Sequence, residues 1–291
     1  MLGGTAQEAS ETQQLDKDKE GYVSRLEVQQ AIRKVINEVF PRTTNDIEAW
    51  FQHRQLDSIT NHKDFQRLCL NMLNGNKIRV MGLSWGELRD SIPDNHFNDS
   101  SYLSIEESVV WFNKIMEHNS ISPREFVERV QSIVDKEYPK INTLLLLGPP
   151  NAGKTLIPNS IVRSCIYYIS PQSFEGTKGF EFEAFLNARI ALVNEPRITD
   201  KTIETMKNIF EGQPVNIDIK YKPSQEGSRC PCICTSNQNL CFYTTARTVN
   251  HQALVARCFT FDFVNMPKLV ECKGQLNPSM WKTLCASFDL D

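Results

Sequence analysis

The segment Leu144-Leu-Leu-Leu147-Gly148-Pro149-Pro150-Asn151-Ala152-Gly153-Lys154-Thr155 decides the fold of this chain. Its four leucines form a continuous apolar run, which is typical of a strand buried on both faces of a parallel sheet. The eight residues that follow have the spacing Gly-x-x-x-x-Gly-Lys-Thr, in the order strand, loop, helix that a phosphate-binding loop requires. The alternative is a glycine-rich turn that arose by chance. The segment predicts an α/β fold that binds a nucleoside triphosphate, with ATP as the expected nucleotide.

The residue types of this loop have chemical reasons. Glycines let backbone N–H groups curl around a β-phosphate, and the N-terminus of the following helix adds partial positive charge. Lys154 would contact the β- and γ-phosphates, and the Thr155 hydroxyl would ligate Mg²⁺. The residues expected to bind the nucleotide are Gly148, Pro149, Pro150, Asn151, Ala152, Gly153, Lys154 and Thr155.

A second apolar strand, predicted over residues 189–193, is followed by Glu195. A carboxylate at the end of a neighbouring strand suits an enzyme that polarises an attacking water, and it would also help to hold Mg²⁺. Asn194 stands where many such enzymes carry a second acid, so the metal would depend on Thr155, phosphates and water. The alternative is that Glu195 only solvates a strand end.

A third strand, over residues 230–234, contains three of the nine cysteines. Cys230, Cys232 and Cys234 alternate at period two, which places them on one face of the strand. We interpret them as reduced core thiols of a reducing compartment rather than as a zinc site. Asn237 follows the strand, and its amide would face the γ-phosphate; an ordinary turn-forming asparagine is the alternative.

The composition agrees with a soluble globular protein, because 40% of the 291 residues are hydrophobic and 23% are charged. The longest aliphatic run, residues 144–147, is too short to span a bilayer, and no secretory signal is visible, so we expect no membrane association. The net charge of −3 restricts any nucleic-acid contact to a loop or channel.

Three parts are predicted along the chain. Residues 1–75 form a helical region without an assigned role, and a turn-forming Asn74-Gly75-Asn76 separates it from helical residues 76–140. In the second part, Ser104 begins a capping box and Ser122-Pro123 begins another helix. Residues 141–291 alternate strands with helices, which predicts a three-layer α/β/α domain around a mainly parallel sheet.

With these strands assembled, the chain resembles the superfamily 3 helicases of small DNA viruses, an offshoot of the AAA+ fold. It is most similar to the large non-structural replication protein of parvoviruses, including densoviruses. The matching segments follow one another within about 90 residues, and the resemblance covers residues 101 to about 263. These segments are residues 148–155, 190–196, 212–222 and 233–239.

The resemblance implies an ATP-dependent DNA helicase of viral DNA replication, with 3′-to-5′ polarity and a location in the host nucleus. It would translocate on single-stranded DNA as a homo-oligomeric ring, a hexamer, and residues 76–140 would form the oligomerisation domain. Lys154 and Thr155 would belong to the Walker A motif, Glu195 would be the Walker B carboxylate, and Asn237 the sensor.

The resemblance also implies roles for residues outside these motifs. Lys220 and Lys222 would lie on a hairpin that projects toward single-stranded DNA, and two lysines around Tyr221 suit contact with phosphates and a stacked base. A solvated hairpin is one alternative. The resemblance implies another, in which one of these lysines points across a subunit interface at the γ-phosphate. Arg257 would be the arginine finger that one subunit supplies to the next, with Arg247 as a second candidate; a structural salt bridge is the alternative.

Two other functions stay open: a nucleotide-dependent scaffold and a protein-remodelling ATPase, and Asn194 favours the scaffold. The nuclease domain of full-length relatives carries a His-hydrophobic-His pair, and none of the five histidines forms one. We therefore expect a helicase fragment or a homologue without nicking activity.

A candidate calcium loop runs from Asp16 to Glu27, with oxygen-bearing residues and a glycine at EF-hand spacing. The entering segment has almost no apolar face, and no partner loop is visible. The alternative is a polar lead into a helix that starts near Ser24.

Overall fold

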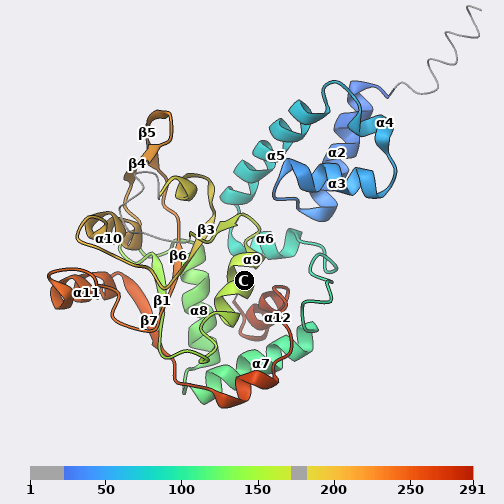
Figure 1. Ribbon diagram of the computed structural model, residues 1–291. Helices are drawn as coiled ribbons and strands as arrows, with labels where there is room; N and C mark the ends of the chain where they lie inside the picture. The colour runs from blue at the N-terminus through green and yellow to red at the C-terminus, as the bar shows by residue number, and fades with distance from the viewer. Residues whose placement is uncertain (1–22, 172–181, 291) are drawn as a thin grey trace, which may run out of the picture. The chain divides into compact units, whose positions relative to one another are not determined.

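The computed structural model describes residues 23–171 and 182–290, which form two compact units that divide at Gly82 (Figure 1). Each unit is described separately below. The helices that follow Gly82 belong to the same unit as the sheet. The roles assigned to residues 1–75, 76–140 and 141–291 remain predictions.

The described part of the first unit contains four helices: α2 (Arg25–Val39), α3 (Thr44–His53), α4 (Asp57–Thr60) and α5 (Phe65–Gly82). The start of α2 near Ser24 is confirmed, because Ser24 and Glu27 form a capping box. The Ser24 amide donates to Glu27 Oε2 at 2.7 Å, and this hydrogen bond lowers the pKa of Glu27. Residues 16–22 of the candidate calcium loop lie outside the described residues.

The predicted break at Asn74-Gly75-Asn76 is wrong, because α5 continues through it. A glycine inside a helix costs about 1 kcal/mol relative to alanine. Leu73 and Val80, seven residues apart, are buried on one face of the helix and hold it across the glycine. Asn76 is buried as well, and its side-chain oxygen accepts hydrogen bonds from Arg79. Tertiary packing therefore outweighs the local preference for a turn.

A parallel sheet organises the second unit, which confirms the predicted α/β fold. Its strands run in the order β2 (Tyr168–Ile169), β3 (Ile190–Asn194), β6 (Cys232–Ser236), β1 (Thr143–Leu147) and β7 (Cys258–Asp262). The leucine run forms the strand that lies between β6 and β7, and every pairing in this sheet is parallel. All carboxyl ends of these strands therefore meet at one edge, called here the carboxyl edge, and all amino ends at the other, the amino edge.

Side chains of β1 alternate between two hydrophobic cores, one on each face of the sheet. Leu144 and Leu146 belong to one core and Leu145 to the other. Helices of the first core are α6 (Trp85–Ser91), α7 (Ile105–His118), α8 (Pro123–Val134), α9 (Leu156–Ser164) and α12 (Met280–Ser287). The second core is formed with η1 (Glu183–Asn187), α10 (Ile203–Glu211) and α11 (Arg247–Val255). The predicted three-layer arrangement is thus confirmed.

Cys232 and Cys234 lie on β6 and Cys230 lies two residues before it, and all three point to one side, as the period-two pattern predicts. Cys230, Cys232 and Cys234 are buried in the second core, and all nine cysteines are free. Burial raises the pKa of the Cys230 thiol to about 12, and it also raises the pKa of Cys232 and Cys234 well above the ordinary value. These side chains are therefore neutral thiols.

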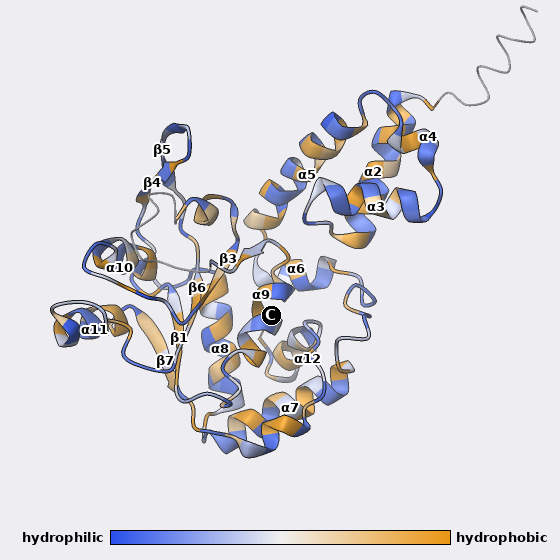
Figure 2. Ribbon diagram, viewed as in Figure 1, coloured by the Kyte–Doolittle hydropathy of each residue, from blue (hydrophilic) through white to orange (hydrophobic). Residues whose placement is uncertain are grey.

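Residues 215–227 form a separate antiparallel hairpin of β4 (Val215–Ile219) and β5 (Lys222–Gly227). β4 is thus not a strand of the parallel sheet. The hairpin follows α10 and leads into the amino end of β6, and its tip is hydrophilic (Figure 2). Across the described residues, no helix combines the length and apolar character that crossing a bilayer requires.

Candidate functional site

The loop from Gly148 to Thr155 connects the carboxyl end of β1 to α9, as the sequence predicts. Gly148 has φ +149°, and a Cβ there would lie 2.1 Å from the carbonyl oxygen of Phe263. Gly153 has φ +87°, and a Cβ there would lie 3.3 Å from a methyl carbon of Ile115. Both glycines are therefore required by the path of the backbone itself.

Residues that follow β7, and that are not part of the motif, hold this loop in place by hydrogen bonds. The Met266 amide donates to Asn151 O at 3.1 Å, and the Asn265 side-chain amide donates to Pro150 O at 3.2 Å. From the adjacent strand, Ser236 O accepts from the Gly148 amide at 3.1 Å. Asn265 and Met266 were missed at the level of sequence, because nothing in their pattern indicates that the chain returns to this loop.

Lys154 is buried, with only 6% of its surface exposed. Its Nζ donates to Pro149 O at 2.6 Å and to Asn237 Oδ1 at 2.9 Å, and both acceptors are neutral. Burial lowers the pKa of Lys154, while the negative charge of Glu195 acts in the opposite direction. A buried ammonium group held by neutral acceptors gains from a nearby anion, so the loop fits a phosphate.

Glu195 comes directly after β3 and has φ +46°, a left-handed conformation that is uncommon for glutamate. Its amide donates to Thr235 O at 2.9 Å, and its Oε2 accepts from the Asn237 amide at 3.0 Å. Strained backbone of this kind costs about 1–3 kcal/mol and is concentrated at functional sites. The strain here holds a carboxylate at the carboxyl edge of the sheet.

Asn194 is tied to the neighbouring strand, because its Oδ1 accepts from the Thr235 hydroxyl at 3.0 Å. The donors left for a metal are the Thr155 hydroxyl and the Glu195 carboxylate. No group of three or more His, Cys, Asp or Glu side chains within residues 23–171 and 182–290 is placed to hold a metal ion. One carboxylate with a hydroxyl fits Mg²⁺, which keeps several waters and shares phosphate oxygens, and it does not fit zinc.

These groups surround a cavity of about 530 Å³. Its lining consists of Pro150, Asn151, Ala152, Gly153, Lys154, Thr155, Leu156, Asn159, Glu195, Asn237, Leu269 and Cys272. Gly148 and Pro149 lie at the start of the loop and support the residues that line it. Leu269, on η2 (Pro267–Glu271), and Cys272 were not predicted, because they reach the cavity only through the return of the chain after β7.

Arg257 is not brought to this cavity. It immediately precedes β7 and therefore lies at the amino edge, whereas the loop lies at the carboxyl edge. Its Nε donates to Glu211 Oε2 at 2.9 Å, and its Nη1 donates to Ala253 O. Arg247 begins α11, where its guanidinium carbon lies 4.7 Å from the centroid of the Phe242 ring.

Lys220 and Lys222 flank the tip of the hairpin and are exposed, as is Tyr221 at 92%. Lys220 Nζ lies 5.1 Å from the centroid of the Tyr221 ring. The hairpin leads into the amino end of β6, so these side chains also belong to the amino edge. The sequence prediction of two lysines on a hairpin is confirmed, and a contact with DNA stays a prediction.

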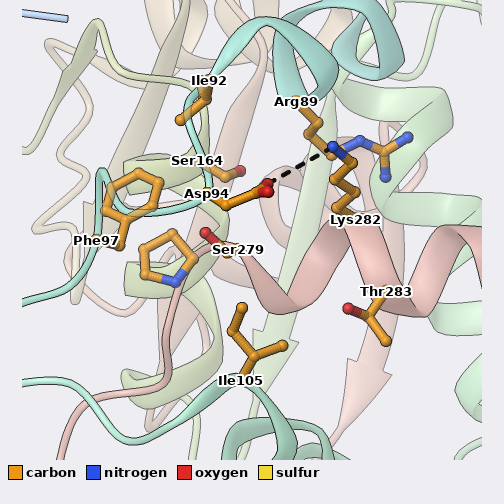
Figure 3. Close-up of a pocket in the computed structure, with 10 residues that line it drawn as sticks. Arg89, Ile92, Asp94, Phe97, Ile105, Ser164, Ser279, Lys282 and Thr283 are labelled. Atoms are coloured by element: carbon orange, nitrogen blue, oxygen red, sulfur yellow. Dashed lines mark ion pairs between the residues drawn. The ribbon is translucent and has the colours of Figure 1, made fainter. Parts of the chain in front are cut away.

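A second, smaller cavity of about 110 Å³ lies between α6, the end of α9 and α12 (Figure 3). Lys282 Nζ is 3.8 Å from Asp94 Oδ1, and Arg89 Nη1 donates to Trp281 O. Isoleucine, phenylalanine and proline side chains form much of its wall. It has no glycine-rich loop and both cations are engaged by the protein, so the larger cavity is the candidate phosphate site.

Comparison with known proteins agrees with this geometry. The family model described as "Parvovirus non-structural protein NS1" matches residues 27–286. The chain belongs to this family. It corresponds to the superfamily 3 helicase-like domain of a viral replication initiator, and its homologues include domains that are ATPases.

Individual relatives support the same assignment. Initiator protein NS1 of Junonia coenia densovirus is 29% identical over 123 residues, which are 42% of this chain and 23% of that protein. Protein Rep52 of adeno-associated virus 2 is 30% identical over 152 residues, 51% of this chain and 38% of that protein. The chain therefore spans less than two fifths of either relative.

The fold is also that of a solved JCV helicase structure. The two share a TM-score of 0.62 at 12% identity, over 89% of this chain and 86% of that one. At this identity the likeness concerns the fold alone. The parallel sheet and the helical N-terminal region thus match the superfamily 3 helicase fold.

Proposed function

We propose that this chain is an ATP-dependent DNA helicase domain that hydrolyses ATP at the 148–155 loop and translocates on single-stranded DNA as a ring, a hexamer. The observation that carries the proposal is a set of three residues that are connected by hydrogen bonds. Lys154, Asn237 and Glu195 follow three adjacent strands and are joined by the bonds Lys154 Nζ to Asn237 Oδ1 and Asn237 N to Glu195 Oε2. They line one cavity at the carboxyl edge of the sheet.

Within this site the chain supplies binding, orientation and a base. Lys154 binds the β- and γ-phosphates, and the backbone of the loop and the N-terminus of α9 cradle them. Glu195 orients the attacking water, and Asn237 fixes the position of both Lys154 and Glu195. Thr155 and Glu195 would hold Mg²⁺, which supplies charge neutralisation at the phosphates when it is bound.

Residues at the amino edge are assigned to partners outside the chain. Arg257 would leave Glu211 and reach the nucleotide of a neighbouring copy, where a guanidinium stabilises charge on the phosphoryl group. Lys220 and Lys222 would contact the phosphates of single-stranded DNA, with Tyr221 available to stack on a base. The 3′-to-5′ polarity and the location in the host nucleus rest on the family resemblance.

A second candidate is a nucleotide-dependent scaffold or a protein-remodelling ATPase without unwinding activity. Asn194 favours it, because the amide is bonded to Thr235 and adds no charge to the metal site.

Unwinding of a forked DNA duplex separates the two proposals. The helicase proposal expects ATP-dependent unwinding that is lost in Lys154→Ala and Glu195→Gln, and hydrolysis that single-stranded DNA stimulates. Hydrolysis by the wild type without binding of single-stranded DNA or stimulation by it would contradict the helicase proposal and favour the second candidate.

A further inference from the structure

Arg229, two residues after the hairpin of β4 and β5, donates hydrogen bonds to four oxygen atoms. Its Nε donates to Asn142 Oδ1 at 2.8 Å, and its Nη1 donates to Lys136 O at 3.1 Å. Its Nη2 donates to Tyr138 O at 2.6 Å and to Ile141 O at 3.0 Å. All four acceptors are neutral, so the guanidinium acts here as a fork of donors and not as one member of an ion pair.

The four acceptors belong to residues 136–142, the connection between α8 and β1 at the amino edge. Asn142 is fully buried, and its Nδ2 donates to Ile209 O at 2.9 Å and to Cys230 O at 2.8 Å. Ile209 belongs to α10, which precedes the hairpin, and Cys230 follows the hairpin. Asn142 therefore joins the two ends of the hairpin, and Arg229 ties them to the connection.

Gly212, the first residue after α10, leaves the space that Arg229 occupies. Its φ is +80°, and a Cβ there would lie 2.6 Å from Arg229 Nε and 3.0 Å from Asn142 Cγ. A side chain at this position would displace the guanidinium, in addition to straining the backbone. The glycine that begins segment 212–222 thus lets the entry to the hairpin lie against the arginine that follows the hairpin.

The hairpin is held near its base and exposed toward its tip, and Figure 1 shows it extending away from the sheet. Ile217 of β4 packs in the second core, whereas β5 is exposed along residues 222–226. This exposed stretch corresponds to about 17 Å of extended strand. A rotation of about 10° at the base would therefore move the tip by about 3 Å, which is enough to break a hydrogen bond to a phosphate.

We propose that Arg229 is a positioning residue: by fixing the base of the hairpin, it determines where Lys220 and Lys222 lie at the tip. The inference rests on the proposed function, in which these two lysines contact single-stranded DNA. Arg229 is engaged by the protein and acts through the lysines rather than on DNA itself. A lysine cannot replace it, because three donors on one nitrogen cannot reproduce the contacts of a planar fork.

The test is a double-mutant cycle on the full 291-residue chain. Arg229→Lys keeps the charge and removes the fork, and Lys220→Ala/Lys222→Ala removes the proposed DNA contacts. Fluorescence anisotropy measures the affinity of these variants, and of the triple variant, for a labelled single-stranded oligonucleotide. Urea denaturation of each variant identifies conditions in which it is folded, so that affinities are compared between folded proteins.

Gly212→Ala is a second, independent variant, since it displaces the guanidinium without removing it. Its control is Gly75→Ala, at a helical position with open space. The matched control for Arg229→Lys is Arg124→Lys, at an exposed arginine of α8 that pairs with Glu128.

We expect Arg229→Lys and Gly212→Ala each to weaken DNA binding about fivefold to tenfold, and no more than the loss of both lysines does. When the two lysines are already absent, Arg229→Lys should cause no further loss of affinity, because it acts through them. Binding of a fluorescent ATP analogue should stay within about twofold of the wild type, since Arg229 lies at the opposite edge from the cavity. Both controls should bind DNA as the wild type does.

Two results would overturn the inference alone. If folded Arg229→Lys and Gly212→Ala proteins bind DNA as tightly as the wild type, Arg229 contributes to stability and does not position the hairpin. If Arg229→Lys lowers the affinity equally with and without the two lysines, it does not act through them. Unchanged DNA binding in Lys220→Ala/Lys222→Ala is a different outcome, because it contradicts the proposed function of the hairpin and the inference with it.

Discussion

The candidate functional residues at the two edges of the parallel sheet differ in what they contact. At the carboxyl edge, Lys154, Asn237 and Glu195 are hydrogen-bonded to one another around one cavity. At the amino edge, Lys222 is exposed at the hairpin and Arg257 is bonded to Glu211. The groups proposed to act together within the chain are thus brought together by its own strands, whereas the groups proposed to act on another molecule contact a local partner or solvent.

The largest expected effect comes from the amino edge. Arg257→Ala should lower turnover of the assembled protein by about 10³-fold or more, the effect known for an arginine finger. Affinity of the single chain for nucleotide should not change, because Arg257 lies away from its own cavity. Phosphate release and equilibrium binding measure the two quantities. Equal losses in both would place Arg257 in the site of its own chain and remove the distinction between the edges.

At the carboxyl edge, Lys154→Ala should reduce hydrolysis by about 10²–10³-fold, as expected when a preorganised electrostatic contact is removed. It should also weaken nucleotide binding, which distinguishes it from Arg257→Ala. Steady-state hydrolysis with binding of a fluorescent ATP analogue tests this expectation. Lys282→Ala, a change in a half-exposed lysine of α12, is the control and should leave both unchanged.

Gly148→Ala tests whether the backbone of the 148–155 loop, at the carboxyl edge, leaves no room for a side chain at this position. The added Cβ would meet Phe263 O at 2.1 Å, and alanine is disfavoured at φ +149°. Strain and overpacking together predict a loss of about 2–4 kcal/mol in the free energy of unfolding. Urea denaturation of the variant and the wild type measures this difference in the free energy of unfolding. Gly75→Ala, at a helical position with open space, is the control and should not destabilise the protein. Equal stability of Gly148→Ala and wild type would show that the approach of Phe263 to the loop is looser than described.

The smallest expected effect concerns the hairpin. Lys220→Ala/Lys222→Ala should weaken binding of single-stranded DNA about tenfold and lower the salt dependence, since each lost phosphate contact reduces the slope by about 0.7. Hydrolysis without DNA should be unchanged. Fluorescence anisotropy at several salt concentrations gives both numbers. An unchanged slope would remove the hairpin from the DNA-contacting surface.

The carboxyl edge was predictable from sequence because its information is local. An apolar run of four leucines, the spacing of glycine, lysine and threonine, and polar residues directly after two other apolar runs indicate the site without any knowledge of packing. Glu195 and Asn237 were found in this way. The pattern could not predict the hydrogen bond between Glu195 and Asn237, because this bond requires β3 and β6 to be neighbours in the sheet.

Other parts of the fold depend on contacts between distant segments. Leu269, Cys272 and Asn265 reach the loop because the chain turns back after β7, and no periodicity signals that return. The helix α5 continues through Gly75 because buried residues on both sides stabilise it. The Glu211 partner of Arg257 is separated from it by 46 residues, so the sequence alone could not indicate how the arginine is held.

The buried thiols near the centre of the sheet also provide a way to measure how often the sheet opens. Thiolate is the form that reacts with alkylating reagents, and burial keeps Cys230, Cys232 and Cys234 as thiols in the folded sheet. Labelling of these positions can proceed only when β6 separates from the core, so its rate measures the free energy of that opening. Because β6 leads directly to Asn237, a lower labelling rate in the presence of nucleotide would show that the bound nucleotide stabilises the sheet at its carboxyl edge.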